Sequence, residues 1–470
     1  MTDLHGRAGD RGTAVVAVST DAAAPAARPN LLSVEQARDR VLAAIDGPLP
    51  PEAVPVPDAL GRVLAAPVIT SLALPPWDNS AMDGYAVRSV DTAAATEFSP
   101  VRLRVVGEVA AGAAATIAVA PGTAVRIATG APVPPGSDAV VPVEQTTPLA
   151  DDGSLAGPRG RDAAGPLPAA TLVHVALHPW DSIRHRGSDM EANAVILEEG
   201  SQVTAAAIAL AAGSGAATVT VYRRPRIAVL ATGDEIRAPG MPLGPAGIPD
   251  ANGPGLRALV RDAGAEPVDL GIAVDRLEDV RARLARGIAE ADAVVVSGGV
   301  SVGPYDVVKA AFEGAGTVEL WRVAVQPGKP FVFGIARRPG AAPDAPRVLL
   351  FGLPGNPVSS FVTFELFVRP AIRRLEGHRS LFRPVDRAVL GQAVSKSSGR
   401  RAYLRVRAER DAAGSPIRDE QGRVRVSLAG SQGSHVMSAL AAADALAVIP
   451  EVHDSLPSGA EVELWWLDRG

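Results

Sequence analysis

The second half of the chain alternates two hydrophobic patterns. Continuous apolar runs such as "RIAVLAT" (226–232) and "DAVVVSGG" (292–299) are typical of strands buried on both faces of a parallel sheet. Apolar residues at helical spacing lie between them, from Leu256 in "GLRALVRDAG" and again in "LEDVRARLARGIAEA". Strands that alternate with helices indicate βαβ units, so this half predicts a doubly wound α/β sheet.

The flanking segments have other patterns. Residues 33–46 carry apolar residues at helical spacing behind Ser33, a residue type that caps helices. Short alternating runs such as "VRLRVVGEV" (101–109), separated by Gly and Pro, indicate a β-rich module before the α/β half. The alternation returns from about residue 384, which predicts a small all-β module there. Residues 147–170 are of low complexity and predict an exposed hairpin tip or insertion.

Composition narrows the class of protein. The 470 residues suffice for several domains, and 47% hydrophobic with 21% charged residues is the range of soluble globular proteins. The net charge of -5 at pH 7 offers no argument for nucleic-acid binding. Because the chain has no cysteine, disulfides, thiolate metal sites and a cysteine nucleophile are excluded, and a cytoplasmic location fits.

The pattern predicts no membrane span, since no apolar run reaches the roughly 18 residues that a bilayer requires. The first 30 residues are rich in Ala and Pro, and charges at Asp3, Arg7, Asp10 and Arg11 interrupt them, unlike the apolar core of a signal peptide. We expect residues 1–30 to form a disordered tail.

Unusual residues follow the predicted parallel strands. They are Asp234 and Glu235 in "ATGDEI", Ser297, Gly298, Gly299 and Asp306 in "SGGVSVGPYD", and Pro354, Gly355, Asn356 and Pro357 in "GLPGNPVSS". Ligands bind beyond the carboxyl ends of such strands, and Gly-rich turns let backbone amides approach a phosphate closely. One such loop is more simply a turn, but three at one edge predict a phosphate-binding site.

Carboxylates are spread along the chain, at Asp78, Asp83, Asp189, Glu235, Asp275 and Asp306. A single Asp in a loop is usually a turn former or a helix cap. If the loops bind phosphate, however, acids that converge on the ligand require a divalent cation between them. Mg²⁺ is held in this way, by carboxylates and substrate phosphates, whereas the seven histidines show no metal-ligand spacing.

One lysine is a candidate anion ligand. Only three of the 46 basic residues are lysines, at Lys309, Lys329 and Lys396. Lys329 lies between two prolines in "QPGKPFVFG", where a rigid turn would hold its compact ammonium toward an anion. The alternative is an ordinary surface lysine.

Several common enzyme motifs are missing. The sequence contains no GxxxxGK[ST] loop and no GxGxxG after a predicted strand. Their absence argues against the common NTPases and dinucleotide-dependent enzymes.

The loop "LPPWDNSAMDGYAV" (74–87) has an unexpected composition. In a chain with 4% aromatic residues it collects two aromatics, two carboxylates and an amide. The residues alone allow two interpretations: a tight turn with an aromatic plug, or a loop that brings Asp78 to a ligand.

Eight segments together resemble one family, the molybdopterin molybdenumtransferases (MoeA), which are related to the E domain of gephyrin. The segments, in the family's order, are "WDNSAMDGYAVR", "RIATGAPVPPGSDAVVPVE", "IRHRGSDM", "ATGDEI", "SGGVSVGPYD", "PGKP", "LPGNPVSS" and "QGSH". They cover residues 31 to 470 approximately, and a chance match to all eight in order is not a serious alternative.

The resemblance implies a multidomain α/β and β protein that forms an elongated homodimer. The implied parts are a helical linker domain (31–55 and 171–222), an inserted β domain (56–170), an α/β domain like the molybdopterin adenylyltransferases (223–380) and a C-terminal β barrel (381–470). The active cleft would lie between the α/β and barrel domains of one subunit and the β domain of the other. Asp78 would then face the ligand across the interface, while Trp77, Met82 and Tyr85 pack.

The implied reaction inserts molybdenum from molybdate into adenylylated molybdopterin and releases AMP. The family's catalytic positions fall on Asp78, Asp189, Glu235, Asp275, Asp306 and Lys329. Its substrate-binding positions fall on Thr129, Ser297, Gly298, Gly299, Lys329, Pro354, Gly355, Asn356, Pro357, Arg405 and Ser434, with Lys329, Arg405 and Ser434 assigned to molybdate. Mg²⁺ is the expected cofactor, with Asp275 and Asp306 as its ligands, and the molybdopterin adenylyltransferase is a candidate partner.

The chain departs from the family pattern at two positions. Gln326 stands where the family often has a lysine, and Pro304 where an acid is common, with Arg322 as a second basic position nearby. Loss of a positive charge at Gln326 predicts weaker oxyanion binding.

Two other functions compete with the enzyme. One is a gephyrin-like dimeric scaffold that binds a protein partner; the retained acids and Lys329 argue against it. The other is the adenylyltransferase that precedes this enzyme, which resembles the α/β domain alone.

Overall fold

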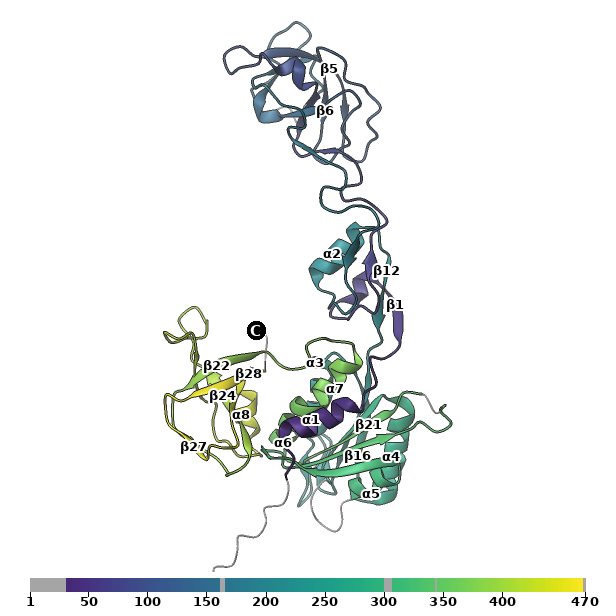
Figure 1. The fold of residues 1–470 in the computed structure, drawn as a ribbon, viewed down its shortest axis with the longest axis vertical. Coiled ribbons are helices and arrows are strands. Elements are labelled where there is room, and N and C mark those ends of the chain that lie inside the picture. The colour runs from purple at the N-terminus through teal and green to yellow at the C-terminus, as the bar shows by residue number, and fades with distance from the viewer. Residues whose placement is uncertain (1–30, 161–164, 300–306, 343–344, 468–470) are drawn as a thin grey trace, which may run out of the picture.

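The computed structural model describes residues 31–160, 165–299, 307–342 and 345–467. Figure 1 shows an elongated molecule with a β module at one end, a narrow arm, and an α/β domain beside a small β barrel at the other end. The predicted tail at 1–30, Pro304 and Asp306 lie outside the described residues. None of the described helices is both long and apolar enough to cross a membrane.

The α/β domain is built on a six-stranded sheet in the order β16-β13-β17-β21-β20-β18. Its strands are β13 (Arg226–Thr232), β16 (Glu266–Ala273), β17 (Ala293–Ser297), β18 (Gly316–Arg322), β20 (Pro330–Ala336) and β21 (Val348–Leu353). The first four in spatial order are parallel, and β20 and β18 add an antiparallel hairpin at one edge. Because β16 and β17 flank β13 on opposite sides, the strand order switches at β13.

Both faces of this sheet are covered by helices, which confirms the doubly wound prediction. Alternate strand residues belong to two separate cores: Val229 and Val295 face one, Leu230 and Val296 the other. The first face packs against α1 (Val34–Ala43), α3 (Asn252–Asp262), α6 (Pro357–Thr363) and α7 (Arg369–Leu375), and the second against α4 (Leu277–Glu290) and α5 (Val307–Glu313). A five-residue π-helical segment, η4 (Phe364–Val368), joins α6 to α7.

Two helices differ from their sequence-based expectation. Helix α3 begins at Asn252, four residues before Leu256, and the Asp250 carboxylate, just before the N-cap residue Ala251, accepts the Gly253 N–H of its first turn (2.8 Å). Helix α1, capped by Ser33 and Gln36, was expected in the linker domain but buries Val34, Ala37 and Val41 in the α/β core.

The arm is a small unit around two antiparallel strands. Strand β1 (Pro51–Pro55) pairs with β12 (Thr218–Tyr222), and helix α2 (Ala205–Gly213) packs beside them with η1 (Val56–Ala59), β2 (Val68–Ile69) and β11 (Val195–Leu197). The chain therefore passes through the arm twice, once on each side of the β module (Figure 1).

The β module contains a six-stranded sheet in the order β7-β4-β6-β5-β9-β8. The strands are β4 (Gly84–Val87), β5 (Val101–Val109), β6 (Thr123–Ile127), β7 (Ala139–Pro142), β8 (Thr146–Leu149) and β9 (Ala170–Val173), with a two-residue pair of β3 (Asn79–Ser80) and β10 (Ile183–Arg184) nearby. The predicted insertion at 147–170 is the end of a hairpin, but Thr147, Leu149 and Ala170 are buried strand residues, so the exposed loop is shorter than expected.

The C-terminal module closes into a barrel, as predicted. Its strands are β22 (Val385–Leu390), β24 (Arg401–Ala408), β25 (Val424–Leu428), β26 (Ala445–Ile449) and β28 (Glu461–Trp466), and pairing of β24 with β26 closes the sheet. A strand of the α/β domain, β19 (Val325–Gln326), pairs in parallel with β24. Backbone pairing therefore attaches the barrel directly to the α/β domain.

A buried ion network joins the helices to the chain that enters the barrel. Arg383 donates to both oxygens of Glu365 (2.9 and 3.0 Å) and to Asp262 (2.7 Å), and Arg369 donates to Asp262 (2.6 Å). The Glu365 side chain is 1% exposed. Although burial opposes its ionisation, Arg383 and Arg369 hold the pKa of Asp262 below its ordinary value.

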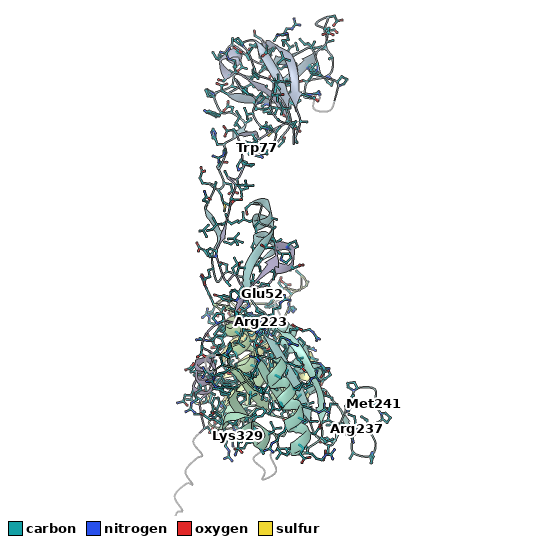
Figure 2. All side chains as sticks on the ribbon, turned by 90° about the vertical axis from the view of Figure 1, so that its right-hand side faces the viewer. Glu52, Trp77, Arg223, Arg237, Met241 and Lys329 are labelled. Carbon is teal, nitrogen blue, oxygen red and sulfur yellow. The ribbon has the colours of Figure 1, made fainter. Side chains whose placement is uncertain are left out.

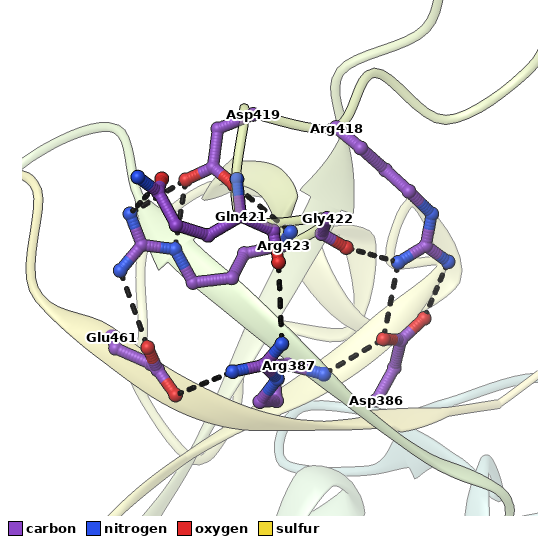
Figure 3. Close-up of polar contacts among 8 residues, drawn as sticks. All are labelled: Asp386, Arg387, Arg418, Asp419, Gln421, Gly422, Arg423 and Glu461. Carbon is purple, nitrogen blue, oxygen red and sulfur yellow. Dashed lines mark hydrogen bonds and ion pairs between the residues drawn. The ribbon is translucent and has the colours of Figure 1, made fainter.

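We predict that Glu365→Gln destabilises the protein by about 3–5 kcal/mol, because it leaves two buried guanidinium groups short of a countercharge. The barrel network in Figure 3 supplies the control: Arg418, whose side chain is 45% exposed, pairs with Asp386 (2.7 Å). Arg418→Ala is expected to cost less than about 1 kcal/mol. Thermal or denaturant unfolding of both variants measures the difference, and equal costs would contradict the assigned role of Glu365.

Candidate functional site

A cavity of about 730 Å³ lies at the carboxyl ends of β13, β17 and β21. It is lined by the loops that follow these strands, by the start of α3 and by two barrel residues. The lining includes Glu235, Asp250, Asn252, Asp275, Ser297, Gly298, Gly299, Pro330, Pro354, Gly355, Asn356, Pro357, His435 and Met437. The three strand-end loops therefore meet in one place, as their positions in the sequence predict.

One side of the cavity is acidic. Glu235 follows β13 and Asp275 follows β16, and the Asp275 N–H donates to the carboxylate of Asp234 (3.1 Å). Burial, together with the charges of Asp234 and Glu235, raises the pKa of Asp275 above its ordinary value. These carboxylates repel one another, so the cavity has an unbalanced negative charge.

The loop after β17 can only be formed by glycine. Gly298 has φ +99° and Gly299 φ +63°, and a side-chain carbon on Gly298 would lie 2.5 Å from the Thr232 carbonyl oxygen. The loop consequently passes close to the end of β13 and presents backbone to the cavity. This is the geometry in which a backbone approaches a phosphate.

The Ser297 hydroxyl belongs to a network that joins the loops. Ser297 is 2% exposed, and its hydroxyl accepts a hydrogen bond from the Asn252 amide (2.8 Å) and contacts the Ser360 hydroxyl (3.1 Å). Ser360 in turn donates to the Pro354 carbonyl. The structure thus places Ser297 at the predicted edge but commits its hydroxyl to neighbouring loops.

The barrel closes the cavity through the "QGSH" loop. The Asn356 amide donates to the Ser434 hydroxyl (3.1 Å), and the Val358 N–H donates to the Ser434 carbonyl (3.1 Å). Arg405, on β24, is 1% exposed and donates to the carbonyls of Ser431 (3.3 Å) and Gly433 (3.1 Å). Burial lowers the pKa of Arg405. This side chain, expected at the oxyanion, holds the loop that carries Ser434.

Lys329 lies in the turn that leads into β20, next to Pro330 at the cavity. Its side chain is half-buried, and among the described residues nothing forms a hydrogen bond or ion pair with its ammonium. The Gln326 side chain accepts a hydrogen bond from the Ser397 N–H of the barrel (3.0 Å). Gln326 therefore stabilises the junction of the two domains at a position where the family often has a charge.

Three predicted site residues lie far from the cavity within one chain. Asp78 accepts a hydrogen bond from the Arg186 N–H (2.6 Å), and Asp189 bonds through its N–H to the Leu74 carbonyl (3.0 Å). Thr129 donates its N–H (2.7 Å) and its hydroxyl (2.8 Å) to Asp83. Figure 2 places Trp77, the neighbour of Asp78, and Lys329 at well-separated levels of the long axis. One chain therefore does not bring the two sets together.

Four cavity residues were not predicted from the sequence: Asp250 and Asn252 at the start of α3, and His435 and Met437 of the barrel. The segment "IPDANG" offered a signal, because an Asp and an Asn at the beginning of a helix face the same edge as the strand-end loops. His435 directly follows the predicted Ser434 in "QGSH", whereas Met437 had no signal, since only the docking of the barrel brings it to the cavity.

The described acids fit a divalent cation in part. Glu235 and Asp275 share the cavity and the negative charge that a cation would neutralise. Among the residues that the structure describes, however, no group of three His, Cys, Asp or Glu side chains could hold a metal ion. Asp306, the second expected ligand, lies outside them.

Three family models match successive parts of the chain. Residues 32–215 match the MoeA N-terminal region (domain I and II), residues 228–374 match the "Probable molybdopterin binding domain", and residues 387–467 match the MoeA C-terminal region (domain IV).

Individual proteins give the same result. Molybdopterin molybdenumtransferase 2 from Mycobacterium tuberculosis is 39% identical over 436 residues, which cover 92% of this chain and 98% of the relative. Molybdopterin molybdenumtransferase from Haemophilus influenzae is 34% identical over 435 residues, with the same coverage of 92% and 98%. The crystal structure of a molybdopterin biosynthesis MoeA protein from Pyrococcus horikoshii OT3 superposes with a TM-score of 0.71 at 26% identity, over 93% of this chain and 100% of that chain.

The negative charge of the cavity predicts that ionised Asp275 destabilises the ligand-free protein. Folding raises the pKa of Asp275, so ionisation of the Asp275 carboxyl favours the unfolded state. The stability that protonated Asp275 contributes is therefore lost as the pH rises through its pKa in the folded protein. Asp275→Asn should therefore raise the melting temperature at neutral pH in the absence of divalent ions. The gain should vanish at acidic pH, where Asp275 is protonated. Thermal unfolding across pH checks this, and a lower melting temperature at neutral pH would disprove the repulsion.

Proposed function

The chain belongs to the molybdopterin molybdenumtransferases, the MoeA family of molybdenum cofactor biosynthesis, and we propose that its strand-end cavity binds adenylylated molybdopterin. There the dithiolene would receive molybdenum from molybdate, with release of AMP. The observation that carries the proposal is the cavity itself: glycine-rich loops and carboxylates from one sheet edge, closed by a barrel loop.

The glycine loops supply the phosphate contacts. Gly298, Gly299 and Gly355 bring backbone to the cavity with no side chain between, and Pro354 and Pro357 hold the ends of the second loop. The Ser297 hydroxyl would act on substrate indirectly, by fixing these loops through Asn252 and Ser360.

Mg²⁺ is the proposed cofactor. Asp275 and Asp306 would hold it, and Glu235 lines the cavity together with Asp275. Bound there, the ion would neutralise the charge shared by these carboxylates and the ligand phosphates.

Molybdate, a substrate, is assigned to Lys329 and the barrel loop. Lys329 directly precedes Pro330, which lines the cavity, and its ammonium has no protein partner among the described residues, as expected of a group reserved for an anion. Arg405 supports Ser434 from behind, so its contribution to the anion is through the loop and through its charge.

A second copy of the chain would complete the site. Asp78, Thr129 and Asp189 belong to the β module and the arm, and Figure 2 shows Trp77, the neighbour of Asp78, far along the long axis from Lys329. Trp77 and Met82, beside Asp78, are 47% and 41% exposed, whereas Tyr85 is buried in the module. Exposed aromatic and thioether groups next to a required acid are expected where a partner surface covers them.

The competing functions have less support. The relatives named above are transferases, which favours the enzyme over a gephyrin-like scaffold. The matches to MoeA regions on both sides of residues 228–374 distinguish the chain from an adenylyltransferase of the α/β domain alone. Delivery of substrate by that adenylyltransferase, and a cytoplasmic location, remain part of the proposal.

A defined assay tests the function. Purified protein with adenylylated molybdopterin, molybdate and Mg²⁺ should release AMP, and omission of molybdate should reduce the release. Release that is independent of molybdate, or no release with verified substrate, would reject the proposal.

A composite site predicts complementation between subunits. Asp78→Ala and Asp275→Ala homodimers should both be inactive, whereas a mixed dimer retains one intact site and should recover part of the AMP release. The control is each variant mixed with itself under the same exchange conditions. A mixed dimer that forms but stays inactive, from variants that fold, would show that one chain supplies the whole site.

Substitutions of Lys329 should affect molybdate more than the pterin substrate. Loss of a charge-assisted hydrogen bond should cost about 1.5–3 kcal/mol, about 10- to 150-fold in half-saturating molybdate, for Lys329→Ala. Lys329→Arg should be impaired less, because it keeps the charge but replaces a compact ammonium by a planar fork. Lys396→Ala, at a barrel lysine, is the matched control. Unchanged half-saturation in Lys329→Ala would reduce Lys329 to a surface residue.

A further inference from the structure

Asn252 has a fixed orientation at the centre of the cavity loops. Its amide nitrogen donates to the Ser297 hydroxyl (2.8 Å) and to the Gly355 carbonyl (2.6 Å). A backbone carbonyl can only accept a hydrogen bond, so the NH₂ end of the side chain must face Gly355. The other end, the Asn252 carbonyl oxygen, is thereby left as an acceptor on a half-buried side chain that lines the cavity.

The surroundings of Asn252 disfavour a phosphate at this point. It is the first residue of α3, whose beginning would otherwise attract an anion. The Asp250 carboxylate already accepts the Gly253 N–H there (2.8 Å), and Asp250 is 9% exposed and lines the same cavity. A phosphate beside Asn252 would meet a carboxylate and a carbonyl oxygen, which both repel it. A ligand group with N–H or O–H would satisfy the acceptor.

We propose that Asn252 is a specificity residue whose carbonyl oxygen accepts a hydrogen bond from an N–H or O–H group of the organic part of the ligand, while its amide ties the β17 loop to the β21 loop. The inference rests on the proposed function, because it assigns a role within the same cavity. It orients the ligand: the phosphates lie against the glycine loops, and a heterocycle or a sugar lies against α3. Asn252 would thus favour binding of a ligand that carries a nucleotide or a pterin over binding of a bare phosphate.

A matched control distinguishes the two roles of Asn252, which are joining the β17 and β21 loops and contacting the ligand. Ser360 belongs to the same network through Ser297 and Pro354, is 1% exposed, and is absent from the cavity lining. Ser360→Ala loosens the loops without removing an acceptor from the cavity. Asn252→Ala loosens them and removes the acceptor, and Asn252→Asp keeps an acceptor but loses the donor to Gly355.

The proposal is tested by measuring the affinities for adenylylated molybdopterin, AMP and inorganic pyrophosphate. Molybdate is left out so that no turnover occurs. Asn252→Ala should weaken the binding of adenylylated molybdopterin about 5- to 100-fold and change the affinity for pyrophosphate much less. Ser360→Ala should lower the affinities for both ligands to a similar, smaller extent. A parallel loss of AMP affinity assigns the contact to the nucleotide half, and an unchanged AMP affinity assigns it to the pterin half. Either result supports the proposal.

Other outcomes overturn it. Equal losses for adenylylated molybdopterin and pyrophosphate in Asn252→Ala would make the residue a loop clamp only, and a deficit removed by excess Mg²⁺ would make it a metal ligand. If Asn252→Ala fails to fold, Asn252→Asp provides the test, because it keeps the acceptor. If Asn252→Asp loses more affinity for adenylylated molybdopterin than for pyrophosphate, each relative to the wild type, the assignment of the acceptor is contradicted. Failure of the wild type to bind adenylylated molybdopterin would reject the proposed function, whereas binding that Asn252→Ala leaves unchanged would reject this inference alone.

Discussion

The parallel pairing of β13, β17 and β21 is the constraint on which the site depends. Parallel strands end at the same edge, so the loops after Thr232, Ser297 and Leu353 must meet there, however far apart they lie in the sequence. The switch in strand order at β13 opens the crevice between them. Carboxylates and glycine-rich loops then gather in a cavity at the ends of strands whose central residues are buried.

The barrel completes the cavity because backbone and side chains hold it in one place. Strand β19 pairs with β24, Gln326 bonds to Ser397, and the Asn356–Ser434 contact closes the loop over the cavity. Arg405 shows how a buried charge can serve this assembly: its guanidinium satisfies carbonyls of the loop that carries Ser434. Changes at these junction residues would act on substrate through the position of the barrel.

The barrel is held against the α/β domain, whereas the arm separates the β module from that domain. It holds the module away from the α/β domain of its own chain, as Figures 1 and 2 show, and polar groups such as Asp78 and Thr129 form hydrogen bonds with nearby residues, Arg186 and Asp83. These short hydrogen bonds order Asp78 and Thr129 within a single chain. In the two-subunit site proposed above, a preorganised acid and hydroxyl would lose little entropy on assembly.

Many local elements, and the sheet edge at which the strand-end loops meet, could be predicted from the amino-acid sequence. Apolar runs and helical spacing predicted β13, β17, α4 and the barrel alternation, because these patterns reflect which faces of an element are buried. The resemblance of eight motifs predicted the family. The fold was needed to show that the Ser297 hydroxyl and Arg405 are buried, that α1 belongs to the α/β core, and that Asn252 joins two loops. These facts depend on contacts between distant segments, such as Asn252 and Gly355, and such contacts leave no local period in the sequence.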